Sequence, residues 1–261
     1  ITQKLSKRSN TYVGKGKLLE IKNNILNSRI DTVICDDELS PNQQLSLEQA
    51  LGTVKVIDRT ALILDIFAGN AHTREGKLQV ALAQQEYLLP RLAGQWTHLE
   101  RLGGGIGTRG PGESQIETDR RIARTRISRL KKDIDKIRQN RSRYRERRRT
   151  TDVKTVALVG YTNAGKSTLL NSLTSSQVVA ENRMFSTLDP VTRKLMLPSG
   201  TNVLITDTVG FVQKLPPNLV AAFRATLEEL MEADLILHVL DVTHIRRKEQ
   251  VDTVEAILED M

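Results

Sequence analysis

The 261-residue sequence contains a single cysteine, Cys35, in the strand-like stretch TVICDD. One cysteine excludes a disulfide framework and a cysteine-based zinc cluster, so we expect a reducing compartment, the cytoplasm. A small buried core residue is the favoured interpretation of Cys35, ahead of a nucleophile. The four histidines are scattered without the spacing of metal ligands, and we assign them no chemistry.

Aromatic residues make up only 3% of the chain, which argues against a platform on which single-stranded bases stack. Long apolar runs are also absent from the sequence. Stretches such as ALILDIF and LILHVL are far too short for a membrane span, and no signal peptide opens the chain. We therefore expect a globular protein without a membrane span, and we expect it to be a monomer.

Positive charge is concentrated in one segment. Residues 119–150 hold 15 Lys and Arg against 4 Asp and Glu, a net charge of +11, whereas the rest of the chain has 24 against 27, a net charge of −3. Four acids cannot neutralise fifteen bases, which argues against a helix face that is merely solvated. The segment predicts a polyanionic partner, most often nucleic acid, that is contacted through its phosphates and shape.

The first part of the chain, residues 1–75, predicts a small α/β domain. Strand-like runs occupy Thr32–Cys35 and Val54–Ile57. In DRTALILDIFAG we expect a short helix, with Asp58 as its N-cap and Gly69 as its C-cap.

Residues 76–150 predict two long helices. Apolar residues recur at helical spacing from Gly76 to Leu102, with Pro90 as the site of a kink. A capping box from Ser114 to Glu117 predicts the start of a second helix over residues 114–149. Its apolar seam is narrow, as in a coiled coil, so we expect it to form an antiparallel hairpin with the first helix. The seam consists of Ile127, Leu130, Ile134, Ile137 and Tyr144, with Arg141 in a skipped position.

The two helices flank the glycine-rich stretch RLGGGIGTRGPGES, whose residues 103–112 form the expected tip loop of the hairpin. It contains a G-x-G-x-x-G pattern, which is typical of a dinucleotide-binding turn. Such a turn follows a strand, however, whereas this glycine-rich stretch follows a helix and is interrupted by Pro111. A slack linker would leave Arg109 and the Pro111-Gly112-Glu113 turn unexplained. We favour a slim probe that enters a narrow site.

A phosphate-binding loop follows in KTVALVGYTNAGKST. A β-branched strand runs into Gly160-x-x-x-x-Gly165-Lys166-Ser167, and LLNSLTS continues as a helix, which is the order that a P-loop requires. Backbone N–H groups of such a loop wrap phosphates at the helix N-terminus. We expect Lys166 to neutralise the β- and γ-phosphates and the Ser167 hydroxyl to bind Mg²⁺.

The strand NVLITD ends in Asp207-Thr208-Val209-Gly210, the D-x-x-G of a switch GTPase. Asp207 is expected to hold Mg²⁺ through water, and the Gly210 N–H to sense the γ-phosphate. Between the two motifs, Thr187 of MFSTLDP is placed to complete the Mg²⁺ shell. DLILHVLD adds a further buried parallel strand.

The fold class expected from these patterns is α/β. A small N-terminal α/β domain (residues 1–75) precedes a long antiparallel helical hairpin (76–150). A P-loop GTPase domain follows (151–261), with a parallel sheet flanked by helices. We expect both ends of the chain to be cut, and the third domain to be incomplete because the guanine-reading N/T-K-x-D motif would lie beyond Met261.

Together these residues resemble the HflX family of ribosome-associated GTPases. The resemblance extends over nearly the whole chain and rests on TYVGKGK, DRTALILDIF, EGKLQVALAQQEYLLPRL, GGGIGTRGPGESQIETDRR, GYTNAGKST, FSTLDP and DTVGF. It implies that the nucleotide is GTP, that the partner is the large ribosomal subunit with its RNA, and that the glycine loop reaches towards the peptidyl-transferase centre. It also implies separation of stalled or idle ribosomes.

The expected site residues follow from the motifs. Catalytic roles are expected for Lys166, Thr187 and Gly210, and Mg²⁺ ligands are expected in Ser167, Thr187 and Asp207. The nucleotide is expected to contact Gly160, Tyr161, Thr162, Asn163, Ala164, Gly165, Lys166, Ser167, Thr168, Phe185, Ser186, Thr187, Leu188, Asp189, Asp207, Thr208, Val209 and Gly210.

Two residues bear on the rate of hydrolysis. Phe211 stands where Ras-like GTPases carry a glutamine that orients water, so we expect slow hydrolysis that the ribosome accelerates. Asn163 matches the P-loop asparagine that binds K⁺ in the similar TrmE-type GTPases. A K⁺ ligand and a plain turn residue are both open interpretations of Asn163.

Two other functions stay open at this point. The chain could be an RNA-binding module that is insensitive to nucleotide, or an ATP-driven enzyme that remodels RNA. Binding to large subunits that depends on a GTP analogue would exclude the first, and the guanine-reading motif would exclude the second.

Overall fold

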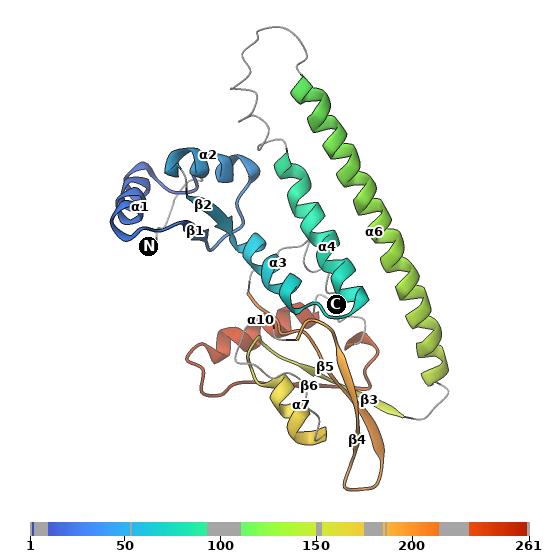
Figure 1. Cartoon of the computed structure of the whole chain (residues 1–261). Helices are drawn as coiled ribbons and strands as arrows, with labels where there is room; N and C mark the ends of the chain where they lie inside the picture. The colour runs from blue at the N-terminus through green and yellow to red at the C-terminus, as the bar shows by residue number, and fades with distance from the viewer. Residues whose placement is uncertain are drawn as a thin grey trace. The chain divides into compact units, whose positions relative to one another are not determined.

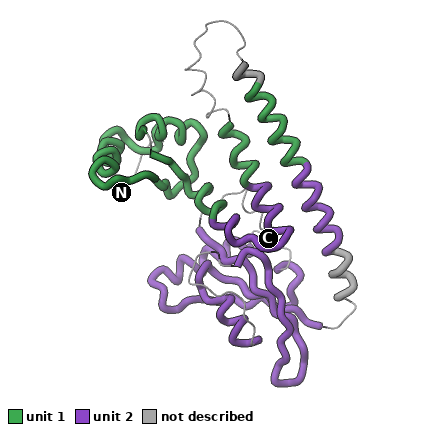
Figure 2. The backbone as a smooth tube through the Cα atoms, viewed as in Figure 1, with its two compact units in different colours: residues 1–65, 84–128 green, residues 66–83, 129–261 purple. Residues whose placement is uncertain are grey.

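The computed structural model describes residues 2, 10–52, 54–92, 111–149, 153–174, 185, 187–213 and 230–259, and in its longest helix the side chains from Gln115 to Arg141. The chain forms two compact units, residues 1–65 with 84–128 and residues 66–83 with 129–261 (Figure 2). The domain boundaries expected from the sequence stay a prediction, and the glycine-rich loop 103–112 lies outside the described residues.

The first unit begins with helices and strands in alternation (Figure 1). Helix α1 (Lys15–Ser28) precedes strand β1 (Thr32–Cys35), helix α2 (Pro41–Leu51), strand β2 (Lys55–Asp58) and helix α3 (Arg59–Asn70), of which residues 66–70 belong to the second unit. The two strands pair in parallel, from Thr32 opposite Lys55 to Cys35 opposite Asp58. This confirms the α/β class that the strand-like runs predicted.

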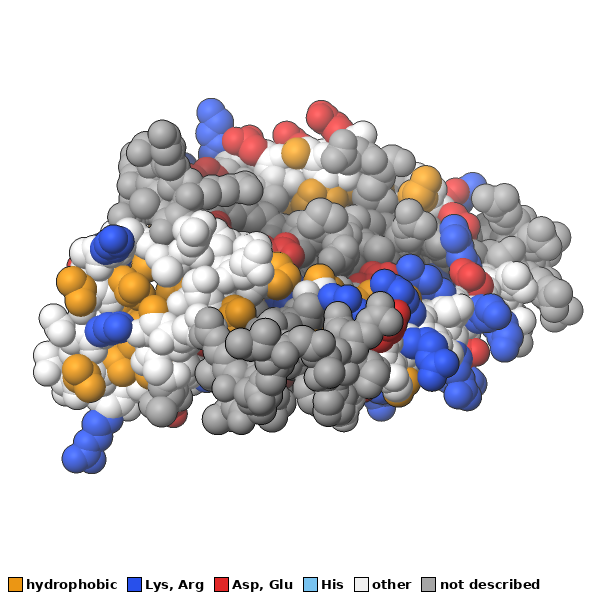
Figure 3. Space-filling model, turned by 90° about the horizontal axis from the view of Figure 1, so that it is seen from above, with side chains coloured by type: hydrophobic (Ala, Val, Ile, Leu, Met, Phe, Trp, Pro, Cys, Tyr) orange, Lys and Arg blue, Asp and Glu red, His pale blue; other side chains and the backbone are white. Residues whose placement is uncertain are grey.

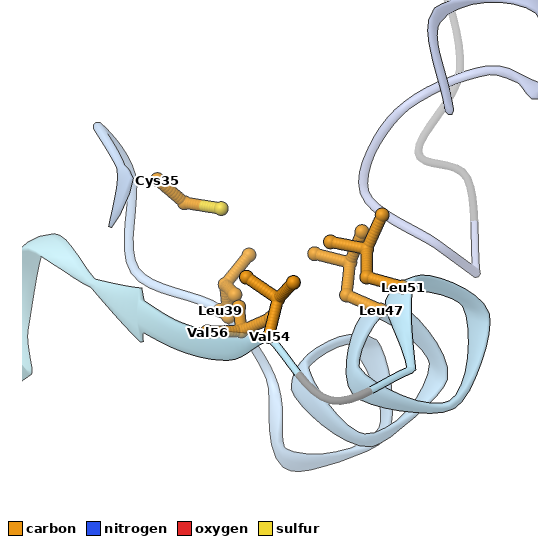
Figure 4. Close-up of a cluster of buried hydrophobic side chains, with 6 residues drawn as sticks. All are labelled: Cys35, Leu39, Leu47, Leu51, Val54 and Val56. Carbon is orange, nitrogen blue, oxygen red and sulfur yellow. The ribbon is translucent and has the colours of Figure 1, made fainter. Parts of the chain in front are cut away.

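Cys35 is a core residue. It lies in a buried apolar cluster with Leu39, Leu47, Leu51, Val54 and Val56 (Figure 4). Burial, reinforced by the charges of Asp58 and Asp37, raises the pKa of the Cys35 thiol to about 11. A thiol with that pKa is protonated at neutral pH, which agrees with a packing role and not with a nucleophile.

Asp58 at the end of β2 organises a buried polar network. Its Oδ1 accepts the Ala61 N–H at 2.8 Å, which confirms the expected N-cap of α3, and the Tyr87 hydroxyl at 2.9 Å. Its Oδ2 accepts the Leu39 N–H at 3.1 Å and lies 3.2 Å from the Arg91 guanidinium. Arg91 also stacks on the Tyr87 ring, 3.5 Å from its centroid.

Tyr87 and Arg91 come from the next helix along the chain. Helix α4 (Arg74–Leu88) ends in a 3₁₀ turn, η1 (Leu89–Arg91), at Pro90, as expected because proline cannot continue an α-helix. The expected C-cap of α3 is wrong: Gly69 lies within the helix, which continues to Asn70.

Helix α6 (Pro111–Arg149) lies beside α4 (Figure 1). Arg141 Nη1 lies 2.8 and 2.9 Å from the two carboxylate oxygens of Glu75, so the start of α4 meets the C-terminal half of α6 and the pair is antiparallel. The expected seam is partly buried at Ile127, Leu130, Ile134 and Ile137, whereas the side chain of Tyr144 lies outside the described part. The capping box at Ser114 is wrong, because α6 already begins at Pro111, a residue suited to the first helical position.

The second unit contains a four-stranded sheet in the order β4-β5-β3-β6. Strands β3 (Lys154–Val159), β5 (Asn202–Asp207) and β6 (Leu235–His238) are parallel, as predicted. Strand β4 (Val191–Met196), which the sequence did not predict, pairs antiparallel with β5 at the edge.

Helices cover both faces of this sheet. Helix α10 (Arg247–Glu259) covers one face through the buried cluster of Ala157, Val159, Phe211, Leu230 and Val254. Helix α7 (Lys166–Thr174) covers the other through Leu158, Leu170 and Ile205. Among the described residues, no helix has the length and apolar character that crossing a membrane requires.

Replacement of Arg91 by methionine is expected to lower the free energy of unfolding by about 3–5 kcal/mol, because it leaves the Asp58 carboxylate buried without its cation. Denaturation in urea measures this loss. Asp36→Ala is the matched control: it removes the acidic partner of Arg59, an ion pair of 2.6 Å whose Asp36 side chain is 83% exposed, and should cost at most about 1 kcal/mol. Equal losses for the two variants would contradict the structural role of the Asp58 network.

Candidate functional site

The loop between β3 and α7, residues 160–165, has the backbone of a phosphate-binding loop. A Cβ atom at Gly160 would lie 2.3 Å from the Val239 carbonyl oxygen, so only glycine fits there. Gly165 has a φ of +92°, in the region that favours glycine. Asn163 between them is also left-handed, with a φ of +63°. The two glycines of the motif are therefore required by the fold of the loop itself.

Lys166, the first residue of α7, lies across this loop. Its Nζ donates to the carbonyl oxygens of Gly160 at 3.3 Å and Tyr161 at 3.0 Å, and its side chain is buried. Burial lowers the pKa of Lys166 to about 8, and the nearby Asp207 carboxylate acts in the opposite direction. The ammonium group is held at the place where the sequence predicts phosphates.

Ser167, Thr187 and Asp207 converge beside Lys166. Asp207 Oδ2 accepts the Ser167 hydroxyl at 2.5 Å and the Thr187 hydroxyl at 3.0 Å, and the two hydroxyl oxygens are 2.8 Å apart. Burial raises the pKa of Asp207, although these hydrogen bonds and the Lys166 charge oppose the shift. The three expected Mg²⁺ ligands therefore meet at one point, although they come from α7, a loop and β5.

The second carboxylate oxygen of Asp207 is unsatisfied. Oδ1 is buried and has no hydrogen-bond partner among the described residues. A buried acceptor without a partner costs free energy, and a divalent cation with oxygen ligands would remove that cost. One carboxylate and two hydroxyls form a donor set that fits Mg²⁺, which prefers oxygen ligands and keeps several waters.

Gly210 closes the pocket against the phosphate loop. A Cβ atom there would lie 2.6 Å from the Thr162 Cα. Backbone hydrogen bonds from Thr162 N–H to the Phe211 carbonyl (2.8 Å) and from Phe211 N–H to the Gly160 carbonyl (3.1 Å) lock the two motifs together. The pocket is lined by Thr162, Asn163, Gly165, Lys166, Ser167, Thr168, Phe185, Thr187, Thr208 and Gly210.

Other expected contact residues lie outside this lining. Leu188 and Val209 are buried in the fold, and Ser186 is outside the described residues. Phe211 is buried and packs in the core beneath the sheet, with no polar group to orient water. Asp189 is not part of the lining. Its carboxylate accepts hydrogen bonds from the backbone N–H groups of His72 and Thr73, and the sequence did not predict this contact.

Three family profiles match the chain in succession. Residues 1–68 match a profile described as GTP-binding GTPase N-terminal, residues 70–148 match GTP-binding GTPase Middle Region, and residues 155–261 match 50S ribosome-binding GTPase. The segments together account for almost the whole sequence.

Curated relatives and a solved structure agree with the profiles. GTPase HflX of Alkalihalophilus pseudofirmus is 55% identical over 262 residues, which cover 100% of this chain and 62% of that protein. GTPase HflX of Escherichia coli K12 is 48% identical over 96% of this chain and 58% of its own length. The chain thus spans about three fifths of the length of these relatives. A crystal structure of an SsGBP and GDP complex has a TM-score of 0.53 and 28% identity, and covers 97% of this chain and 67% of that one.

The lowered pKa of Lys166 predicts a pH-dependent affinity for phosphate-bearing ligands. Such ligands favour the charged ammonium, so above pH 8 the free protein must take up a proton on binding, and the affinity should fall about tenfold per pH unit. Titration of a fluorescent nucleoside triphosphate between pH 7 and 9.5 measures this effect. Lys166→Ala is the control, with weak and pH-independent binding. A constant affinity over this range in the unmutated protein would refute the assignment.

Proposed function

The chain belongs to the HflX family of GTPases, and from this premise we propose that it binds and hydrolyses GTP with Mg²⁺ and associates with the large ribosomal subunit. The observation that carries the proposal is the convergence of Ser167, Thr187 and the half-satisfied Asp207 carboxylate beside the buried Lys166.

Each residue of this cluster has a proposed role. Lys166 neutralises charge on the β- and γ-phosphates, and backbone N–H groups of residues 160–167 hold the phosphate oxygens. Ser167 and Thr187 would bind Mg²⁺ through their hydroxyls, and the Asp207 carboxylate would hold it through water. When bound, Mg²⁺ supplies neutralisation of the charge that develops on the phosphates. Gly210 lines the same pocket as Lys166 and Ser167, and its N–H is proposed to sense the terminal phosphate.

Guanine as the base is supported by similarity. The matched profiles are described as GTP-binding, and the SsGBP structure was solved with GDP. We infer the same base here from these relatives, because phosphates and Mg²⁺ are common to the complexes of all nucleoside triphosphates and do not distinguish one base from another.

Association with ribosomal RNA is supported by α6. Between Gln115 and Arg141, most of its Lys and Arg side chains are exposed. Figure 3 shows several exposed Lys and Arg side chains gathered on one side of the surface, with some acidic side chains among them. The profile that matches residues 155–261 carries the description 50S ribosome-binding GTPase. We propose that the factor separates or rescues stalled or idle ribosomes.

A switch GTPase should bind large ribosomal subunits better with a non-hydrolysable GTP analogue than with GDP, by about fivefold or more. Cosedimentation with purified subunits in both nucleotides measures the ratio. Equal binding in the GTP analogue and GDP would identify a nucleotide-insensitive RNA-binding module. A third sample contains a non-hydrolysable ATP analogue, and binding as strong in it as in the GTP analogue would identify an ATP-driven enzyme. Either result would overturn the proposal.

The same assay tests α6. Reversal of the exposed Arg124, Arg129 and Lys132 to glutamate should weaken binding and lower the salt slope by about 3, since each lost phosphate contact removes about 1. Reversal of the exposed Lys194, Arg247 and Lys248 changes the net charge equally away from α6 and serves as the control. Equal effects would show that only net charge matters.

Hydrolysis by the protein alone should be slow, because Phe211 is buried and cannot orient water, and large subunits should accelerate it. We further propose that K⁺ accelerates hydrolysis through Asn163, whose left-handed backbone shapes the loop. Rates in K⁺ and Na⁺ buffers, with and without subunits, test both proposals. Equal rates in the two salts would leave Asn163 as a turn residue, and an intrinsic rate at the stimulated level would contradict activation.

A further inference from the structure

The loop that carries Thr187 is attached to the connection between α3 and α4. We call residues 185 and 187–189 the switch segment and residues 70–73 the α3–α4 connection. Asp189 Oδ2 accepts the backbone N–H groups of His72 at 2.9 Å and Thr73 at 2.8 Å, and its Oδ1 accepts the Thr73 hydroxyl at 2.5 Å. All these residues belong to the same compact unit (Figure 2).

Asp189 acts as a helix cap from a distant part of the sequence. Helix α4 begins at Arg74, and its first N–H groups have no partner within the helix. Thr73 caps one of them, since its hydroxyl accepts the Gly76 N–H at 2.9 Å. The Asp189 carboxylate binds the two N–H groups just before the helix, where the helix dipole favours an anion. The N-terminal cap of α4 is therefore completed by the Asp189 side chain, which belongs to the switch segment.

Phe185 attaches the other end of the switch segment. Its N–H donates to the Thr162 hydroxyl of the phosphate loop at 3.0 Å, and its carbonyl accepts the Asn70 side-chain amide at 2.8 Å. Its ring meets Phe67 of α3 edge-on, with centroids 4.7 Å apart. Phe185 is 2% exposed and has a φ of +59°, a conformation that L residues adopt only when their surroundings hold them there.

Thr187 lies between these two anchors. Among the described residues, neither anchor is hydrogen-bonded to Asp207, but both hold the segment from which the Thr187 hydroxyl donates to Asp207 at 3.0 Å. We propose that Asp189 and Phe185 are positioning residues, which hold Thr187 at the Mg²⁺ site by fastening the switch segment to the α3–α4 connection.

The consequence is energetic coupling between the phosphate site and the start of α4. A ligand that fixes Thr187 stabilises the cap of α4, and by linkage a partner that orders α4 stabilises the hydrolytic arrangement of Thr187. This inference rests on the proposed function, because it assumes a triphosphate with Mg²⁺ at Asp207.

Gly76 offers a variant that breaks the contact from the helix side. A Cβ atom at Gly76 would lie 2.3 Å from Asp189 Oδ1, whereas at Gly69, in the last turn of α3, it would meet nothing within 4 Å. Both changes, Gly76→Ala and Gly69→Ala, favour the helix by intrinsic propensity. If only helix stability mattered, the two variants would behave alike.

We expect Gly76→Ala and Asp189→Ala to slow single-turnover GTP hydrolysis about tenfold and to change the affinity for GDP less than about twofold, because Lys166 and the phosphate loop stay in place. Asp189→Asn keeps an oxygen that accepts the His72 and Thr73 N–H groups and should recover most of the rate. Gly69→Ala should hydrolyse GTP like the unmutated protein. Normal hydrolysis by Gly76→Ala and Asp189→Ala would overturn the proposal.

Hydrogen exchange provides the second readout. The His72 and Thr73 amides should exchange at least about fivefold more slowly with Mg²⁺ and a GTP analogue than with GDP, and Asp189→Ala should abolish the difference. If the analogue binds but exchange is equal in the two nucleotides, the coupling does not exist. If neither nucleotide binds, the proposed function itself fails.

Discussion

The Asp207 carboxylate is the group on which the functional site depends. Strand pairing places Asp207 opposite Leu158 at the end of β5, in the buried interior of the sheet. There, Oδ2 is satisfied by two hydroxyls, whereas Oδ1 has no partner among the described residues. A buried charge in this condition is unfavourable by itself. The fold therefore contains a buried carboxylate oxygen without a hydrogen bond, and a bound cation would remove this unfavourable state. Lys166, Ser167 and Thr187 all lie around the Asp207 carboxylate.

A second buried aspartate shows what a satisfied carboxylate looks like in the same chain. Asp58 accepts two backbone N–H groups and a tyrosine hydroxyl, and Arg91 supplies the opposite charge. Nothing is left for a ligand to contribute, so Asp58 stabilises the fold of residues 1–65 and 84–128. The two aspartates end parallel strands in a similar way. Their difference lies in whether the protein itself completes their hydrogen bonds.

Features encoded in contiguous residues were predictable from the sequence. The phosphate loop, the D-x-x-G motif and the strands β3, β5 and β6 each depend on local spacing, because one strand and one turn bring the key groups together. Two features that depend on distant partners were not. The Asp189 contact with Thr73 spans 116 residues, and β4 forms only as an edge strand on β5. Helix ends at Asn70 and Pro111 were missed, because the neighbouring glycine and capping box suggested other ends.

The basic segment shows a further limit of reasoning from charge alone. The net charge of residues 119–150 gives the same weight to each of the fifteen Lys and Arg residues in this segment. The structure separates them: Arg141 continues the partly buried seam of α6 and is held by both oxygens of Glu75, so its charge is already compensated within the protein. Arg124, Arg129 and Lys132 lie on the exposed side of the same helix. Affinity for a polyanion should therefore follow the cations that the helix presents to solvent, and the pair of α4 and α6 determines which ones these are.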